Sequence, residues 1–190
     1  LVTKTFLPSY SEFYEMRQFQ PGPKKADWIW VDGVEIPFGP QILFECEEMP
    51  DLVVSAEICE DVWSPIPPSI EAALCGASVI VNCSASDETV GKDSYRSRLI
   101  SGQSARLISG YIYANADVVF GGHNIIAENG TILEKTKRFV NETIYSEFDI
   151  ERIVSERRKN TTFQMSEHYG DLIHVPFSLD MVDTKLTRPF

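Results

Sequence analysis

The sequence lacks a long apolar run and carries little positive charge. No stretch approaches the roughly 20 consecutive apolar residues of a membrane-spanning helix, and the N-terminus lacks the pattern of a signal peptide. Lys and Arg number 17 against 28 Asp and Glu, which gives a net charge of −11. Because a chain this acidic repels phosphate backbones and anionic lipid surfaces, we expect neither a nucleic acid nor a membrane as partner.

Metal-binding and cofactor motifs are also missing from the sequence. The three histidines are scattered, the four cysteines form no CxxC pair, and no spacing joins the two residue types into a zinc site. The chain contains neither GxGxxG nor a Walker phosphate loop. We therefore expect no metal and no cofactor in this domain. A domain of 190 residues can fold without disulfides, so the sparse cysteines predict a reducing, cytoplasmic location.

What the sequence does contain is an alternation of apolar runs and helical patterns. Strands are predicted at 28–31, 34–38, 42–46, 52–59, 78–85, 111–114, 118–126, 131–134 and 143–149. Helices are predicted at 67–74, 94–109 and 150–159. Asp32-Gly33 and Asn129-Gly130 are hairpin signals. This order predicts an α/β domain around one sheet or two, followed by an extended tail from Leu172.

One cysteine is distinguished by its position. Cys59 ends the apolar run 52–59, which is rich in β-branched residues, and three acidic side chains lie within two positions of it. These neighbours are Glu57, Glu60 and Asp61. Nearby negative charge disfavours a thiolate, and a buried cysteine at a strand end is commonly an inert apolar residue. A catalytic interpretation needs a compensating cation, for which Lys4 is the candidate, although an isolated surface lysine is the alternative.

Five sequence blocks, taken in order, resemble the nitrilase superfamily of carbon–nitrogen hydrolases. They are KTFLPSYSEFYE at 4–15, EICED at 57–61, PPS at 67–69, NCSAS at 82–86 and Gly91-Lys92. More narrowly, the combination resembles the glutaminase domain of glutamine-dependent NAD synthetases, from residue 1 to at least Phe163. The resemblance implies an α/β fold, the α-β-β-α four-layer sandwich of the nitrilase type, here lacking its N-terminal segment.

The resemblance also implies the catalytic residues. Cys59 would attack the carboxamide carbon of glutamine and form a thioester, which water then hydrolyses to glutamate. Lys4 would hold the thiolate and, together with the backbone N–H of Glu60, stabilise the oxyanion. The family's general base is a glutamate upstream of the lysine, whereas only three residues precede Lys4 and none is acidic. Glu12 matches a second glutamate of the superfamily, which orients the lysine and the substrate.

Five positions match residues that contact glutamine in the resembled synthetases. They are Tyr10, Phe13, Glu60, Ser86 and Lys92. The resemblance implies pocket walls from the aromatic rings, a hydrogen bond from Ser86, and contacts of Glu60 and Lys92 with the amino-acid head group. Many resembled sequences carry arginine at the Lys92 position, which would bind a carboxylate in a bidentate manner. A second departure is the absence of a short Gly/Ser/Thr-rich loop at 114–118.

The implied function is hydrolysis of glutamine to glutamate and ammonia. The ammonia would serve the ATP-dependent amidation of deamido-NAD to NAD, a ligase reaction whose ATP and Mg would bind in an absent synthetase domain. On this interpretation residues 1–190 form a partial amidase domain, with 172–190 as a tail or linker toward that NAD synthetase domain. Glutamine, the synthetase domain and further copies in a homo-oligomer would be the partners. The alternatives are a stand-alone hydrolase of another amide, nitrile or carbamoyl substrate, and an inactive fragment.

Overall fold

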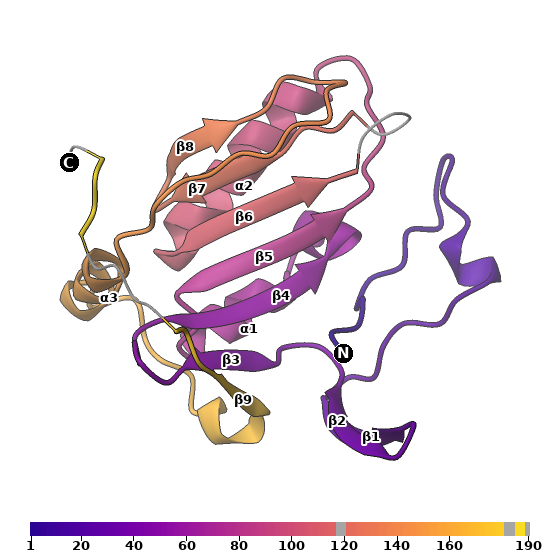
Figure 1. Cartoon of the computed structure of the whole chain (residues 1–190). Coiled ribbons are helices and arrows are strands. Elements are labelled where there is room, and N and C mark those ends of the chain that lie inside the picture. The colour runs from indigo at the N-terminus through magenta and orange to yellow at the C-terminus, as the bar shows by residue number, and fades with distance from the viewer. Residues whose placement is uncertain (117–120, 181–184, 189–190) are drawn as a thin grey trace.

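One large mixed sheet forms the centre of the molecule (Figure 1). The computed structural model describes residues 1–116, 121–180 and 185–188. Seven strands are hydrogen-bonded in the order β8-β7-β6-β5-β4-β3-β9. Their bounds are β3 (Leu43–Cys46), β4 (Val53–Ile58), β5 (Val79–Ser84), β6 (Gly110–Asn115), β7 (Ile125–Glu128), β8 (Thr131–Lys135) and β9 (His174–Phe177). Strands β4, β5 and β6 are parallel, so their carboxyl ends meet at one edge of the sheet.

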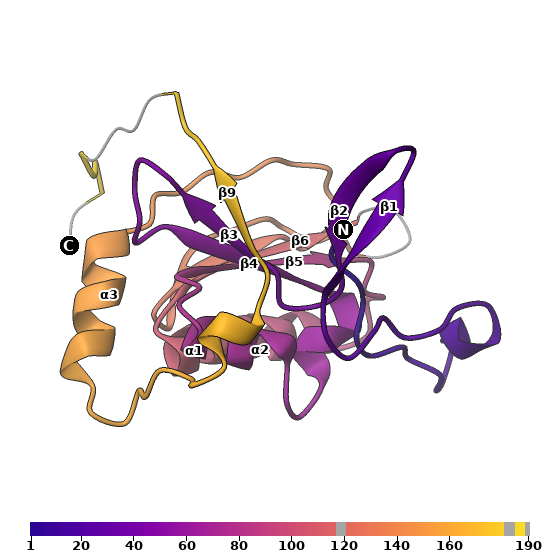
Figure 2. The ribbon, with the colours of Figure 1, turned by 90° about the horizontal axis from the view of Figure 1, so that it is seen from below.

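Two helices cover one face of this sheet (Figure 2). Helix α1 (Pro68–Leu74) connects β4 to β5 and α2 (Lys92–Leu107) connects β5 to β6, as crossover helices do between parallel strands. Helix α3 (Ile150–Lys159) is capped by the preceding Asp149, whose side chain accepts a hydrogen bond from the backbone N–H of Arg152. Among the described residues, no helix has both the length and the apolar character needed to cross a bilayer.

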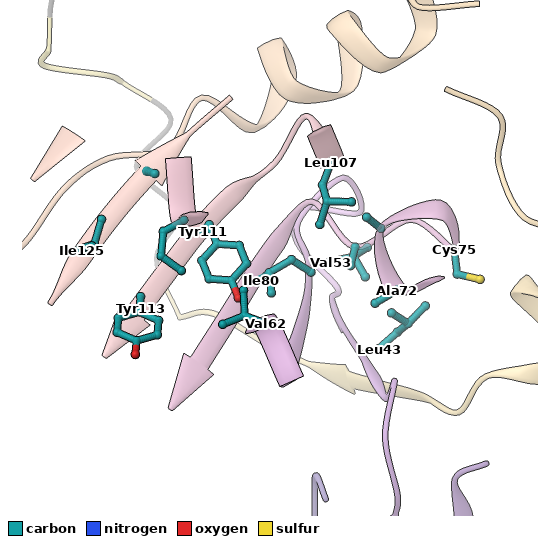
Figure 3. Close-up of a cluster of buried hydrophobic side chains, with 14 residues drawn as sticks. Leu43, Val53, Val62, Ala72, Cys75, Ile80, Leu107, Tyr111, Tyr113 and Ile125 are labelled. Carbon is teal, nitrogen blue, oxygen red and sulfur yellow. The ribbon is translucent and has the colours of Figure 1, made fainter. Parts of the chain in front are cut away.

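The main core lies between the sheet and helices α1 and α2 (Figure 3). Buried and partly exposed residues alternate along β4, because successive strand side chains point to opposite faces. Each large apolar side chain that is fully buried contributes about 1.5–3 kcal/mol to folding. The core therefore fixes the register of β4, and with it the place of the residue that follows the strand. Its fully buried side chains include Leu43, Ile80, Ile100, Tyr111 and Ile125.

A hairpin and three single-turn helices lie outside the large sheet. Strands β1 (Asp27–Val31) and β2 (Val34–Phe38) pair antiparallel around Asp32 and Gly33, whose φ angles are +49° and +80°. The predicted hairpin is therefore confirmed, and its turn has the left-handed backbone that favours this dipeptide. The single-turn helices are η1 (Glu15–Arg17), η2 (Cys59–Trp63) and η3 (Tyr169–Asp171).

The α/β prediction is confirmed, and two elements occupy the predicted residues without any shift, strand β2 at 34–38 and helix α3 at 150–159. The second predicted hairpin is also confirmed, since Asn129 and Gly130 join β7 to β8 with φ angles of +42° and +89°. Strand β4 ends at Ile58, one residue earlier than predicted.

Two strand predictions are wrong. No strand forms at 143–149, where the chain runs over the surface to the start of α3. The strand predicted at 118–126 begins only at Ile125; its residues 118–120 lie outside the described part of the chain. Gly121 and Gly122 have φ angles of +63° and +56°, which interrupt the extended backbone before β7.

The segment from Leu172, expected only to be extended, contributes strand β9 to the sheet. His174 to Phe177 pair parallel with β3, in register from Leu43↔His174 to Cys46↔Phe177. The described part of the predicted tail therefore begins inside the sheet.

Candidate active site

The end of β4 presents Cys59 at the edge where the parallel strands finish. The strand stops at Ile58, and Cys59 starts η2 with a φ of +50°. A non-glycine residue with positive φ is uncommon, and such strained positions cluster at functional sites. The carbonyl of Cys59 accepts a hydrogen bond of 3.4 Å from the Asn82 amide of β5. The cysteine thus leaves the alternation of the strand and lies at the carboxyl end of the sheet, where ligands bind in α/β folds.

Cys59 lines two cavities. The first, here named the Lys4 cavity, has a volume of about 620 Å³. Besides Cys59 and Lys4, it is lined largely by polar groups from the ends of β5 and β6 and from the segment before α3. These residues include Ser84, Asn115, Asn141 and Glu142, and the cavity is also lined by Glu15 of the N-terminal segment and by Asn124, which precedes β7. The structure therefore brings the predicted cysteine and the predicted lysine to one cavity, although they are far apart in the sequence.

The carboxylate partner of Lys4 differs from the expected one. The Lys4 ammonium donates to both oxygens of Glu15, at 2.8 and 2.6 Å, in a partly buried ion pair. Glu12, which the resemblance assigned to the orientation of this lysine, instead lines the second cavity and interacts with Asp87. The intervening turn decides this, because η1 begins at Glu15 and the backbone N–H of Glu15 is bonded to the carbonyl of Pro8.

The second cavity, here named the Lys92 cavity, has a volume of about 490 Å³ and contains every predicted glutamine-contacting residue. It is lined by Tyr10, Glu12, Phe13, Cys59, Glu60, Trp63, Ser86, Asp87, Lys92 and Tyr95, among others. Aromatic rings and charged groups of both signs face one space that includes the cysteine. An amino acid with a polar side chain has the matching chemistry, because its head group carries both charges.

The charged groups of the Lys92 cavity are paired with one another. The Tyr10 hydroxyl donates to Glu60 at 2.6 Å, and this hydrogen bond raises the pKa of Tyr10 to about 12. Lys92 forms an ion pair with Asp87 and lies 5.4 Å from the centre of the Trp63 ring. Burial is the largest single influence on Asp87 and raises its pKa, but Lys92, Glu12 and Arg96 together outweigh burial and the net pKa is lowered. The charged groups of a bound ligand would therefore replace existing partners of these side chains.

Ser86 is positioned by its backbone. It is 4% exposed, and its N–H donates to the side-chain oxygen of Asn115 at 2.8 Å. The backbone N–H of Asn115 in turn donates to the side chain of Asn124 at 2.8 Å. These two asparagines thereby connect the walls of the two cavities, a role that the sequence does not indicate because neither residue belongs to a catalytic or glutamine-contacting motif.

A buried ionic cluster bonds to the backbone of Asp87, a residue that lines the Lys92 cavity. Arg96 of α2 is fully buried and donates to Glu88 at 2.9 Å and to the backbone carbonyl of Asp87 at 3.2 Å. Its guanidinium also lies 3.1 Å from Nδ1 of His123. Burial and the charge of Arg96 lower the pKa of His123. The cluster therefore fixes the segment that follows β5. The sequence pattern of α2 did not indicate this role of Arg96.

Asp61 was considered in the sequence only as a charge unfavourable to a thiolate. In the structure it is 1% exposed and accepts hydrogen bonds from three backbone N–H groups. One donor is Ile58, three residues earlier, a spacing typical of side chains that cap a helical turn. That spacing was the available signal; the other two donors, Thr5 and Phe6, come from the distant N-terminal segment.

The cysteines differ in accessibility. Cys46 and Cys75 are buried, and burial raises the pKa of the Cys75 thiol to about 11. Cys83 is exposed and lines the Lys4 cavity. In residues 1–116, 121–180 and 185–188, no cluster of three or more His, Cys, Asp or Glu side chains could hold a metal ion.

Known proteins with related sequences are glutamine-dependent NAD(+) synthetases. Those of Mycobacterium bovis and Mycobacterium tuberculosis are 37% identical to this chain over 195 residues, which is 95% of this chain and 29% of theirs. The homologue of Aquifex aeolicus is 26% identical over 97% of this chain and 30% of its own length. The chain thus spans less than a third of the length of the curated relatives it matches. No protein-family model matches the chain.

Solved structures share the fold. The glutamine-dependent NAD(+) synthetase of Cytophaga hutchinsonii superposes with a TM-score of 0.61 and 28% identity, over 72% of this chain and 22% of that one. A carbon–nitrogen hydrolase from Helicobacter pylori superposes with a TM-score of 0.60 over 82% of this chain and 54% of that one. The second pair is 19% identical, so it shows the nitrilase-type fold and no more.

Proposed function

Because this chain belongs to the family of glutamine-dependent NAD(+) synthetases, we propose that it hydrolyses the side-chain amide of glutamine and supplies the ammonia for NAD synthesis. The observation that carries this proposal is the place of Cys59 between two cavities. One of them holds Lys4, and the other holds charges and aromatic rings suited to an amino acid. The ligase reaction itself, with its ATP and Mg, would belong to another part of the natural polypeptide.

In the proposed reaction the Cys59 sulfur attacks the carboxamide carbon of glutamine. The carbon–nitrogen bond breaks, the thiol proton goes to the leaving nitrogen, and ammonia departs from a thioester. Water then adds hydroxyl to the acyl carbon and returns a proton to the sulfur, which gives glutamate and free enzyme. Lys4 would favour the thiolate by its charge, and the backbone N–H of Glu60 would stabilise the oxyanion of both tetrahedral intermediates.

The Lys92 cavity would select the amino-acid end of the substrate. Lys92 would exchange its ion pair with Asp87 for one with the α-carboxylate, and the carboxylates of the cavity would take the α-ammonium. Lysine is a compact charge with no bidentate fork, so we expect it to contribute attraction more than orientation. Tyr10 and Phe13, whose rings meet edge to face at 6.2 Å, would form one wall.

The test compares two sources of nitrogen in the natural polypeptide that contains this chain. Cys59→Ser and Lys4→Met should each abolish NAD synthesis from glutamine and leave synthesis from free ammonia unchanged, because ammonia bypasses the thioester. Cys75→Ala is the matched control, since this buried cysteine lines neither cavity. It should retain both activities.

Two outcomes would contradict the proposal. Unchanged glutamine-dependent synthesis in Cys59→Ser would exclude Cys59 as the nucleophile. Turnover of simple amides, nitriles or carbamoyl compounds in preference to glutamine would favour the alternative of a stand-alone carbon–nitrogen hydrolase. A cytoplasmic homo-oligomer remains our prediction for the assembly and location, and sedimentation of the natural polypeptide tests the assembly.

A further inference from the structure

Asp61 joins the two chain segments that meet at the Lys4 cavity. Its Oδ1 accepts hydrogen bonds from the backbone N–H groups of Thr5, at 3.0 Å, and Phe6, at 2.8 Å. Its Oδ2 accepts from the backbone N–H of Ile58 at 2.9 Å. The first two donors directly follow Lys4, and the third directly precedes the reactive cysteine. One carboxylate therefore fixes the distance between the two segments.

The two segments are anchored differently apart from this carboxylate. Ile58 belongs to β4 and is paired within the centre of the large sheet. The N-terminal segment is attached to the periphery, where the backbone of Thr3 bonds to Gly39 beside the β1–β2 hairpin. Figure 1 shows this segment passing the carboxyl ends of the parallel strands. Asp61 is 1% exposed, so water does not compete for its hydrogen bonds.

Building on the proposed function, we propose that Asp61 is a positioning residue that holds the Lys4 ammonium beside the Cys59 thiol. It acts through backbone groups next to both residues and touches neither the substrate nor the reacting atoms. The three backbone N–H groups take up three of the roughly four acceptor positions of the carboxylate, as expected of a group that holds the backbone in place. A displacement of 1 Å in a reacting arrangement can reduce turnover by about 100-fold, which is the loss expected when this connection is removed.

The ionised form of Asp61 is the one that its partners select. Burial is the largest influence on this carboxyl and leaves its pKa raised overall, whereas the hydrogen bonds from Ile58, Phe6 and Thr5 act in the opposite direction and favour the ionised form. The nearby charge of Lys4 also favours that form. Asparagine has the same shape but only one acceptor oxygen, so Asp61→Asn would turn an N–H donor toward one of the three backbone donors. The substitution therefore weakens the connection without removing volume from the site.

The experiment measures the rate at which iodoacetamide alkylates Cys59 in the natural polypeptide, read by peptide mass spectrometry at neutral pH. Because the thiolate is the reacting form and an adjacent cation favours it, Lys4→Met should slow alkylation about tenfold. Asp61→Asn should slow it to a similar extent. The double variant should be no slower than Lys4→Met alone, because Asp61 acts only through Lys4.

The matched control is Glu57→Gln, which alters another buried carboxylate of the same strand end. Glu57 bonds to the Tyr111 hydroxyl and to the backbone N–H of Ser69, on the core side of the sheet and away from Lys4. It should reduce thermal stability and leave the Cys59 alkylation rate within about twofold of the unmodified protein. Thermal unfolding and ammonia-dependent synthesis confirm that each variant is folded.

This experiment distinguishes a failure of the positioning role of Asp61 from a failure of the proposed function. Two results would overturn the positioning role and leave the proposed function intact. One is an alkylation rate in the double variant that is reduced by the product of the two single reductions. The other is a normal alkylation rate in Asp61→Asn. Normal alkylation in Lys4→Met would remove the cation from the proposed mechanism itself. In steady-state assays, positioning through Lys4 predicts a fall in kcat for glutamine with little change in KM. A larger change in KM than in kcat would also contradict the positioning role.

Discussion

At the scale of single residues, Cys59 and Cys83 should be separable by the probe used. Both line the Lys4 cavity, but only Cys59 also lines the Lys92 cavity, in which an amino acid would bind. A glutamine-like diazoketone should therefore label Cys59 alone, and excess glutamine should protect it. Iodoacetamide should in addition label Cys83, which is exposed, and glutamine should not prevent that reaction. Peptide mass spectrometry showing the diazoketone on Cys83, with Cys59 untouched, would contradict the assignment.

Tyr10→Phe should weaken glutamine binding without changing the chemical step. The hydroxyl of Tyr10 donates to Glu60 at 2.6 Å, but the tyrosine is more than half exposed, so solvent discounts the loss. We expect a rise in KM of about threefold to tenfold, equivalent to about 1 kcal/mol, and an unchanged kcat. Because the raised pKa of about 12 keeps this hydroxyl protonated at working pH, the alkaline limb of the pH–rate profile should be the same in both proteins. A shift of that limb in Tyr10→Phe would show that Tyr10 itself titrates.

The partners of the site residues were harder to predict from the sequence than their identities. The sequence blocks nominated Cys59, Lys4 and the residues of the Lys92 cavity, and the structure collects them around two adjoining spaces. The contact of Lys4 with Glu15 depends on the turn at η1, which sequence spacing does not determine. Asp61 is a comparable case, because two of its three donors are distant in sequence and contribute backbone N–H groups, which leave no side-chain signal.

At the scale of elements, Arg157 should be essential for the attachment of α3. Its guanidinium donates to the backbone carbonyls of Leu107 (2.9 Å), at the end of α2, and Ala77 (2.7 Å), in the loop that precedes β5. Burial lowers the pKa of Arg157 to about 10, so the side chain stays charged at neutral pH. Arg157→Ala should reduce the free energy of unfolding by about 3 kcal/mol, because it leaves buried carbonyls without donors.

Urea unfolding of Arg157→Ala and of Arg158→Ala provides the comparison. Arg158 is exposed on the next position of the same helix, and its replacement should change stability by less than about 0.5 kcal/mol. Equal effects of the two substitutions would show that helix propensity, and not the carbonyl contacts, determines the attachment of α3.

Elements with strong local signals were predictable, and those defined by distant pairing were not. Helix α3 has an aspartate at its start and a periodic apolar face, and both hairpins have a turn dipeptide that tolerates positive φ. Strand β9 has only four residues, and its pairing with β3 is a long-range contact. The segment 143–149 is the opposite case. Its sequence pattern is typical of a strand, but the segment pairs with no other strand in the described part of the structure.

At the scale of the whole molecule, the two faces of the large sheet are unequally covered. Helices α1 and α2 bury one face. On the opposite face α3 packs on Val79 at one end, whereas the other side chains of the central strands are apolar and remain partly or fully exposed. These residues are Val54, Ala56, Ile58, Val81, Cys83, Ile112 and Ala114. A four-layer sandwich would pack a second sheet on this face. The nitrilase-type fold of the structural neighbours therefore accounts for an apolar face that a two-layer protein would not leave open.

This uneven burial predicts how residues 1–190 behave when they are expressed alone. An open apolar sheet face favours self-association, which sedimentation velocity would detect as species larger than one chain. Glutaminase activity should also be at least about 100-fold below that of the natural polypeptide, because a positioned base contributes roughly 10²–10⁴-fold. The family's base is expected upstream of Lys4. Full turnover by a monomer whose intact mass begins at Leu1 would show instead that a carboxylate of this chain activates the water. Glu15 and Glu142, which share the Lys4 cavity with Cys59, and then Glu12, would be the residues to replace.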